Sequence, residues 1–277
     1  MSSKLYIVST PIGNLQDITL RALNTLKEVD LIACEDTRTT KKLLLRYQIN
    51  KPLTSYHEHN EIEKAKELLS MLQNGKSIAL VTDAGTPGVS DPGFRIVKLA
   101  SENGVQVVSI PGPSASIAAL SISGLPTFGF AFFGFPPRQK KRLTEYLERL
   151  KDYPETLIFY ESPRRVIKTL EAMVEVLGER NASLSREITK MYEETLRGTL
   201  SEIKELLQSR DSLKGEFTLV VEGASQEKKE FDSETLHDLL LYLKNEGLSL
   251  KDAVRQVTAD SGVSKSKIYK KALQIWG

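Results

Sequence analysis

The sequence has little of what secreted, membrane and disulfide-bonded proteins use. Its single cysteine, Cys34, excludes an internal disulfide and fits a reducing compartment. No apolar run approaches the ~18–20 residues that a membrane-spanning helix needs. The apolar segment at residues 5–8 is too short for the hydrophobic part of a signal peptide. These absences predict a cytoplasmic protein.

An excess of charge of one sign is also absent, because 38 Lys and Arg face 36 Asp and Glu and leave a net charge of +2. Apolar residues make up 40% of the chain, which excludes disorder as its main state. The basic residues nevertheless cluster. Any one cluster can be a solvated surface, but several beside loops and helices favour an anionic polymer as partner. The clusters are Arg38, Lys41, Lys42 and Arg46; Arg138, Lys140, Lys141 and Arg142; Arg164 and Arg165; and Lys265, Lys267, Lys270 and Lys271.

Short apolar runs alternate with helical patterns over the first ~125 residues. Strands are predicted at residues 5–9, 31–34, 78–81 and 105–110, and helices around residues 20–27, 43–45 and 118–122. Such alternation predicts βαβ units and a largely parallel sheet. A second α/β segment follows, with helices around residues 143–150 and 166–177 and strands at 156–160 and 217–221. The predicted domains are residues 1–124, 125–224 and 225–277.

The last ~45 residues read as helices. Leucines from Leu236 to Leu243 and apolar residues from Leu250 to Val257 recur at helical spacing. Residues 260–262 are predicted to form a turn, and Ser264 can cap a final helix. The outline fits a helix-turn-helix, and it fits a generic three-helix bundle equally well. Residues 225–230 are predicted to form a charged linker.

Three predicted strands end in loops rich in Gly and Pro, at residues 10–14, 82–93 and 111–116. Because ligands of parallel sheets bind beyond the carboxyl ends of the strands, three such loops predict a binding cleft. The chain lacks both the G-x-G-x-x-G pattern of dinucleotide sites and the P-loop pattern. The loops offer backbone amides, hydroxyls and the carboxylate of Asp83, which suits a neutral or zwitterionic nucleoside-like ligand.

The amino-acid sequence of several segments resembles that of the tetrapyrrole methylase superfamily. Within it, the longer motifs are similar to those of enzymes that methylate the ribose 2′-hydroxyl of a cytidine in the decoding region of 16S ribosomal RNA. The resemblance spans about residues 4–275. It is carried by LYIVSTPIGNL at residues 5–15, EDTR at 35–38, YHEHNE at 56–61, DAGTP at 83–87, PGPSA at 111–115, FYESP at 159–163 and GEFTLVVEG at 215–223.

The resemblance implies a class III methyltransferase fold, in which two α/β domains hold S-adenosylmethionine (SAM) in the cleft between them, here followed by a small helical domain. It also implies a homodimer and 16S rRNA as the partner. The residues that it places at the cofactor are Pro11, Gly13, Asp83, Ala84, Gly85, Thr86, Ser114, Ala115, Glu161, Thr189 and Thr218.

Methyl transfer to a hydroxyl needs a group that accepts the proton. The candidates are Asp36, His57, His59, Glu58 and Glu61, and His matches a neutral working pH best. Two histidines at i and i+2 would face the same way in a strand. They can equally shape the loop or position RNA, and Asp36 can hold Arg38 against a phosphate. No third ligand at metal-site spacing accompanies the His pair.

Two other functions would explain part of these sequence features. A precorrin-type tetrapyrrole methyltransferase would use the same fold, but the basic clusters and the helical tail favour RNA. A non-catalytic nucleic-acid-binding regulator would use the tail and leave the three loops without a purpose.

Overall fold

The computed structural model describes residues 3–225, 233–261 and 263–277. The chain forms two compact units, residues 1–224 and 225–277. Within the described ranges, no helix has both the length and the apolar character needed to cross a membrane. Most of the predicted linker, residues 226–230, lies outside the described residues.

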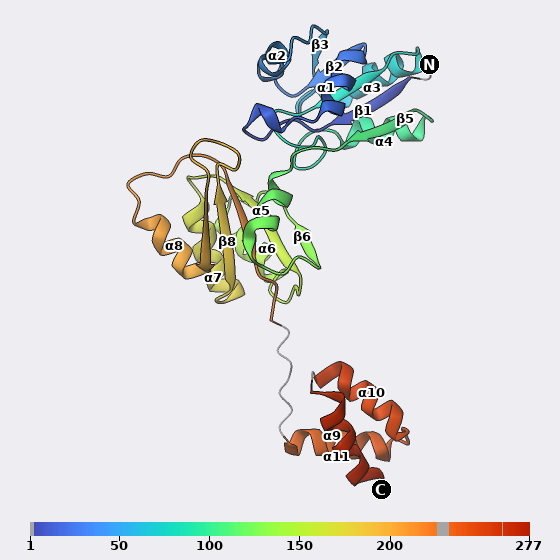
Figure 1. Ribbon diagram of the computed structural model, residues 1–277, viewed down its shortest axis with the longest axis vertical. Helices are drawn as coiled ribbons and strands as arrows, with labels where there is room; N and C mark the ends of the chain where they lie inside the picture. Colours follow the sequence, from blue (N-terminus) through green and yellow to red (C-terminus); the bar gives the residue numbers. More distant parts are fainter. Residues whose placement is uncertain (1–2, 226–232, 262) are drawn as a thin grey trace. The chain divides into compact units, whose positions relative to one another are not determined.

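The first unit begins with a five-stranded parallel sheet in the order β3-β2-β4-β1-β5 (Figure 1). Its strands are β1 (Lys4–Val8), β2 (Leu31–Cys34), β3 (Leu53–Ser55), β4 (Ile78–Val81) and β5 (Gln106–Ile110). A short 3-10 helix, η1 (Leu15–Asp17), follows the loop after β1. The other helices are α1 (Leu20–Glu28), α2 (Thr37–Arg46), α3 (Glu61–Gln73) and α4 (Phe94–Glu102). The predicted parallel sheet is confirmed, with β3, α3 and α4 as elements that the sequence pattern did not reveal.

Alternating side chains of this sheet enter two cores. On β4, Ala79 and Val81 pack with α1 and α2, whereas Ile78 and Leu80 pack with α3 and α4. Since both faces are covered, the strand is a continuous apolar run rather than an alternating one. This double burial explains why the sequence revealed the strand so clearly.

A second sheet completes the first unit, in the order β6-β7-β10-β8-β9. Only the β6–β7 pair is parallel, and the other three pairs are antiparallel. The strands are β6 (Phe130–Phe132), β7 (Thr156–Glu161), β8 (Asn181–Arg186), β9 (Glu194–Thr199) and β10 (Phe217–Val221). The helices are α5 (Ala115–Ser123), α6 (Lys140–Glu148), α7 (Val166–Leu177) and α8 (Leu200–Gln208). The predicted helix around residues 143–150 thus ends at Glu148.

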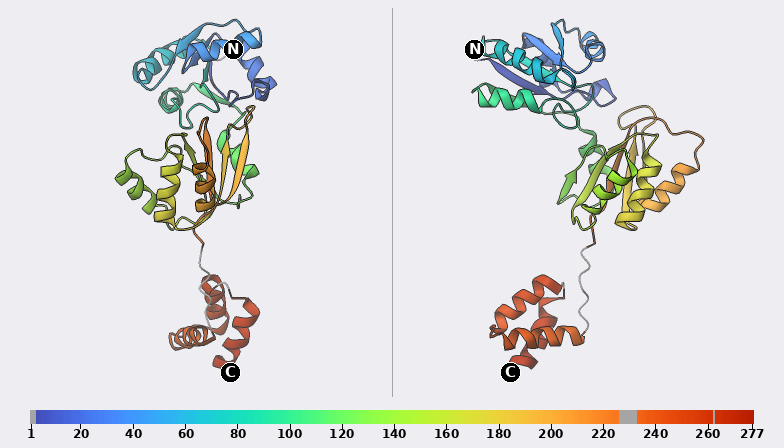
Figure 2. Two further views of the ribbon diagram at one scale, coloured as in Figure 1. Left: turned by 90° about the vertical axis from the view of Figure 1, so that its left-hand side faces the viewer. Right: turned by 180° about the vertical axis from the view of Figure 1, so that it is seen from behind.

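Helices cover both faces of the second sheet as well (Figure 2). The helices α6, α7 and α8 share one core with Leu157 and Leu219, while α5 packs on the other face against Ile158 and Val220. The chain therefore changes sheets before α5, although the predicted boundary follows residue 124. The three-part division of the chain stays a prediction.

The second unit contains three helices, α9 (Ser233–Asn245), α10 (Leu250–Ser261) and α11 (Lys265–Trp276). They share their own core, which includes Leu240, Val254 and Ile268. The turn predicted at residues 260–262 is wrong for its first two residues, because α10 continues to Ser261; residue 262 is outside the described residues. Ser264 is the N-cap of α11, without a capping bond from its side chain.

Candidate active site

The three Gly/Pro loops meet at one edge of the first sheet, as predicted. They follow β1, β4 and β5, which are neighbours and run parallel. Thr10 and Gly85 exchange two backbone hydrogen bonds of 2.9 and 3.1 Å, and the hydroxyls of Ser9 and Thr86 lie 2.8 Å apart. A Cβ on Gly112 would lie 2.9 Å from that of Ser9, so the third loop packs directly on the first.

A cavity of about 590 Å³ lies beside these loops. Ile12 of the loop after β1, the loop after β4 and the start of α5 form part of its wall, and strands and loops of the second sheet form the rest. Hydroxyls and backbone groups alternate there with apolar side chains such as Ile12, Ile117 and Ile188. Seven of the residues predicted to contact a cofactor line the cavity: Ala84, Gly85, Thr86, Ser114, Ala115, Glu161 and Thr218.

The other four predicted cofactor residues are outside the cavity lining. Pro11 is buried, and Asp83 accepts a hydrogen bond of 3.1 Å from the backbone N–H of Asp36. A Cβ on Gly13 would lie 2.5 Å from Cγ of Lys190 and 2.8 Å from Oγ1 of Thr189. Gly13 and Thr189 therefore join the two sheets by close approach of the chain.

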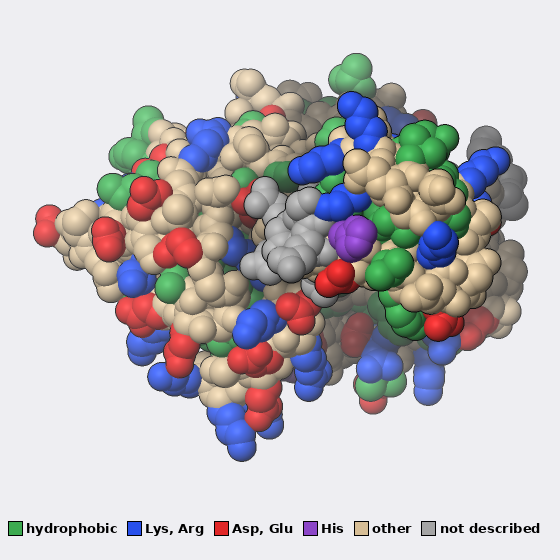
Figure 3. Space-filling model, turned by 90° about the horizontal axis from the view of Figure 1, so that it is seen from below, with side chains coloured by type: hydrophobic (Ala, Val, Ile, Leu, Met, Phe, Trp, Pro, Cys, Tyr) green, Lys and Arg blue, Asp and Glu red, His purple; other side chains and the backbone are tan. Residues whose placement is uncertain are grey.

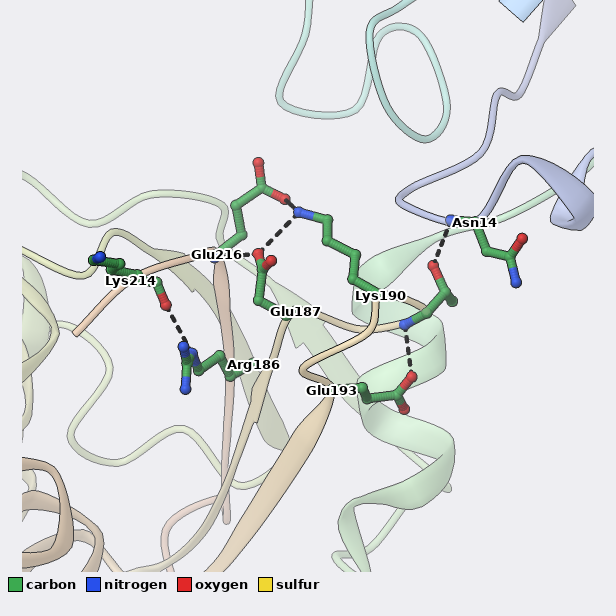
Figure 4. A network of polar contacts seen from close by, with 8 residues as sticks. Asn14, Arg186, Glu187, Lys190, Glu193, Lys214 and Glu216 are labelled. Carbon is green, nitrogen blue, oxygen red and sulfur yellow. Dashed lines mark hydrogen bonds and ion pairs between the residues drawn. The ribbon is translucent and has the colours of Figure 1, made fainter. Parts of the chain in front are cut away.

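The hairpin loop between β8 and β9 makes this contact, and a polar network holds it (Figure 4). Lys190 donates to Glu187 at 2.9 Å and to Glu216 at 3.0 Å, and this pairing lowers the pKa of Glu187. The backbone N–H of Thr189 donates to Glu193 at 2.7 Å. Glu187 and Thr189 have φ values of 52° and 68°, a region that costs energy for residues with a Cβ. The network thus keeps a strained loop against the cavity, where Ile188 forms part of the wall.

Glu161 has a buried carboxylate that is already fully partnered. Thr169 donates to it at 2.6 Å and the N–H of Ser162 at 2.7 Å, and Arg165 forms an ion pair at 3.3 Å. Arg165 also donates to the carbonyl groups of Pro136 and Pro137, at 2.8 and 3.1 Å. Both side chains therefore hold the wall of the cavity in place, and Arg165 is turned away from its predicted role at RNA.

Asp36 is placed to bind Arg38 rather than to accept a proton. It caps α2, and its carboxylate receives hydrogen bonds from the Arg38 guanidinium at 2.7–3.2 Å. These bonds lower the pKa of Asp36 to about 2. A carboxylate with so low a pKa is a weak base, and Asp36 is also outside the cavity lining.

The two histidines do not have the predicted strand geometry. β3 ends at Ser55, and residues 58–60 form a turn. The rings of His57 and His59 are 6.0 Å apart at an interplanar angle of 65°. The Nδ1 atom of His57 is buried without a hydrogen-bond partner, and neither ring lines the cavity. The expectation that they face the same way along a strand is therefore wrong.

Asp91 is a cavity residue that the sequence did not single out. Burial raises its pKa to about 6, with a further rise from the carboxylate of Glu35 and a smaller one from Asp83, while the Thr82 hydroxyl lowers it. The same hydroxyl donates to Glu35 at 2.9 Å. The signal in the sequence was weak: Asp91 is a second carboxylate in the loop that contains Asp83, far from the end of the strand.

Most of the predicted RNA-binding side chains are exposed. In the first unit these are Arg38, Lys41, Lys42 and Arg46 on α2, Arg138, Lys140, Lys141 and Arg142 at the start of α6, and Arg164. In the second unit Lys265, Lys267 and Lys270 on α11 are exposed and Lys271 is half-buried. On the face seen in Figure 3, Lys and Arg side chains are interspersed with Asp and Glu.

Comparison with known proteins identifies the family. The sequence model described as Tetrapyrrole (Corrin/Porphyrin) Methylases matches residues 4–204. Ribosomal RNA small subunit methyltransferase I from Halalkalibacterium halodurans is 49% identical over 96% of this chain and 93% of its own length. The protein of the same name from Escherichia coli O157:H7 is 46% identical over 99% and 96%.

Solved structures show the same fold at low sequence identity. The methyltransferase CobJ has a TM-score of 0.60 at 18% identity, covering 81% of this chain and 95% of its own. Uroporphyrin-III C-methyl transferase from Thermus thermophilus, complexed with S-adenyl homocysteine, has a TM-score of 0.55 at 19% identity, covering 79% and 97%. The predicted class III fold is confirmed. The chain belongs to the tetrapyrrole methylase family, in the same group as the ribosomal RNA small subunit methyltransferase I proteins.

Proposed function

We propose that this chain transfers the methyl group of SAM to the 2′-hydroxyl of a cytidine in the decoding region of 16S rRNA. The observation that carries the proposal is the cavity, whose wall contains seven residues that the family resemblance assigns to the cofactor. The family membership and the names of relatives 44–49% identical to the chain support a methyltransferase with a ribosomal RNA substrate.

The residues of the cavity fit SAM in size and in chemistry. A volume of about 590 Å³ is within the ~300–1,000 Å³ of small-molecule sites. Ala84, Gly85 and Thr86 would hold the donor with backbone groups and a hydroxyl, and Ser114, Ala115 and Thr218 would hold it from other sides. A cluster of phosphate-binding cations does not line the cavity among the described residues, in keeping with a donor that carries no phosphate.

When bound, SAM supplies an electrophilic methyl group on a positively charged sulfur. The chain contributes alignment, because transfer is an in-line displacement that needs the attacking oxygen close to the methyl carbon. The apolar side chains of Ile12, Ile117 and Ile188 would keep water from the bound donor, so that the positive charge consumed in the reaction is poorly solvated. The fully partnered Glu161 and the held hairpin loop keep these walls in one position.

Exposed cations would hold the RNA. Phosphate contacts from Lys and Arg position a nucleic acid without reading its sequence. Arg38 is suited to this role because its side chain is 87% exposed and Asp36 holds its guanidinium in place. The predicted homodimer and cytoplasmic location stay predictions.

Methyl transfer from tritiated SAM tests the proposed function. The purified chain is offered 30S particles, free 16S rRNA or uroporphyrinogen III, and the modified nucleoside is identified by mass spectrometry. Label in 2′-O-methylcytidine is the expected result. Label in the tetrapyrrole would show that the substrate is a tetrapyrrole and not RNA. Binding of SAM without any methyl transfer to RNA would contradict the proposed reaction.

A further inference from the structure

Transfer of a methyl group to a ribose hydroxyl releases a proton, and a group beside the methyl donor must accept it. Among the described residues that line the cavity, four have side chains that titrate: Asp91, Tyr160, Glu161 and Glu216. His57, His59 and Asp36 are not among them. A proton acceptor in the cavity wall is therefore one of these four residues.

Three of the four are occupied in other ways. The carboxylate of Glu161 is buried and partnered by Thr169, Ser162 and Arg165. Glu216 is 77% exposed and forms an ion pair with Lys190 at 3.0 Å. Burial raises the pKa of Tyr160, so its phenol stays protonated, and its oxygen accepts the N–H of Ser116 at 3.3 Å.

Asp91 faces a different set of groups. The carboxylates of Glu35 and Asp83 and the hydroxyl of Thr82 act on it, and Asp91 in turn raises the pKa of Tyr160. Half-burial among carboxylates makes Asp91 a better base than a solvated Asp, with a pKa of about 6. At neutral pH it is ionised and ready to accept a proton.

The loop holds Asp91 at the cavity from two sides. The chain folds back on itself, so that a Cβ on Gly93 would lie 2.8 Å from the backbone nitrogen of Gly88. On the other side, a Cβ on Gly134 would lie 2.9 Å from Oγ of Ser90, beside Phe135 of the cavity wall. Ser90 has a φ of 64°, a strained value for a residue with a side chain. Ser90 and Asp91 both line the cavity.

We propose that the Asp91 carboxylate accepts the proton of the ribose 2′-hydroxyl as that oxygen attacks the methyl carbon. The new bond joins oxygen to carbon while the bond between carbon and sulfur breaks. The electron pair of the broken carbon–sulfur bond stays on sulfur, which becomes a neutral thioether. Asp91 passes the proton to water after the products leave. This inference rests on the proposed function and assigns its catalytic base.

The substitution Asp91→Asn keeps the shape of the side chain and removes its ability to accept a proton. We expect kcat to fall about 100-fold or more, within the range for general bases, while the Kd for SAM measured by calorimetry changes less than twofold. The wild-type rate should rise with pH through an inflection near pH 6, which the variant loses. Glu102→Gln, an exposed carboxylate on α4 that pairs with Lys98, is the matched control.

A second variant covers the case in which Asp91→Asn impairs SAM binding. Glu35→Gln removes the carboxylate that raises the pKa of Asp91, so the inflection should move to lower pH. A purely structural role for Asp91 would leave the inflection where it is. An Asp91→Asn enzyme with more than a tenth of normal kcat and an unchanged pH profile would show that Asp91 is not the base, and would leave the proposed function standing. Wild-type enzyme without RNA methylation would instead overturn the proposed function.

Discussion

At the scale of single residues, the site combines groups that stabilise the fold with one that destabilises it at neutral pH. The carboxylate of Glu161 is buried, and Thr169 and the half-buried Arg165 partner it. Asp91 is ionised at neutral pH although burial and nearby carboxylates oppose its charge. Such a cost is typical of functional residues, whose task conflicts with stability.

Asp91 should therefore reduce stability as the pH rises. Its folded pKa of about 6 exceeds the ordinary value of 3.8, so the folded state binds more protons between these values. The favourable contribution is complete below pH ~4 and is lost as the pH rises through about 6. We expect Asp91→Asn to stabilise the chain at pH 7.5 by about 1 kcal/mol, after allowance for solvent screening.

Urea unfolding at pH 7.5 and at pH 3.5 measures this difference. The gain should be present at the higher pH and absent at the lower one. A gain of equal size at both pH values would mean that the substitution acts through packing, and would contradict the assigned ionisation.

At the scale of elements, the sequence revealed what was buried on both sides. β1, β2, β4 and β10 are interior, largely apolar strands, and all were predicted within a residue or two. The edge strand β5 was also predicted, because Val107, Val108 and Ile110 are apolar, although only Ile110 is buried. β3 has three residues, all half-buried, at the edge of its sheet. β8 buries Ser183 and Ser185, so its polar sequence gives no strand pattern. The short length of β3 and the buried hydroxyls of β8 therefore hid these strands.

The same distinction applies to the site. Loops that directly follow apolar strands could be placed from the sequence, since the strand fixes their position. Gly13 was assigned to the cofactor, but its contact with Lys190 depends on a hairpin more than 170 residues away. Asp91 reaches the cavity only because its loop folds back. Long-range contacts of this kind leave no local pattern.

Gly13→Ala tests the contact between the first loop and the hairpin. The added Cβ would lie 2.5 Å from Lys190, so the hairpin must move, at a cost of about 1–3 kcal/mol. We expect weaker SAM binding as well, since Ile188 of the same loop lines the cavity.

The control is Gly13→Ala combined with Lys190→Ala. Removing Cγ of Lys190 relieves the closest contact, so the two losses of stability in urea unfolding should be less than additive. Fully additive losses would show that Gly13 and Lys190 do not press against each other.

At the scale of the whole molecule, the proposed donor site and part of the proposed RNA-binding surface lie in different units. The cavity lies entirely within residues 1–224, whereas the basic helix α11 belongs to a unit with its own core. We expect a chain ending at Ala224 to bind SAM with unchanged affinity and to bind RNA less tightly, with a shallower dependence on salt because fewer phosphates are contacted.

Calorimetry with SAM and RNA titrations at several salt concentrations make this measurement. Full-length protein with Lys265, Lys267 and Lys270 changed to Gln is the matched variant, and it should lose RNA affinity in the same direction. Equal RNA affinity and equal salt dependence for the truncated and complete chains would show that the helical unit does not bind RNA.

The most direct test of the account is whether the cavity is the place where SAM binds. Ala115→Trp puts a large ring into the cavity at the start of α5, and Ser121→Trp puts the same ring on an exposed position of that helix. Calorimetry should show SAM binding to the wild type and to Ser121→Trp, and none to Ala115→Trp. A wild-type chain that takes up no SAM, or an Ala115→Trp chain that binds it as tightly as the wild type, would contradict the account.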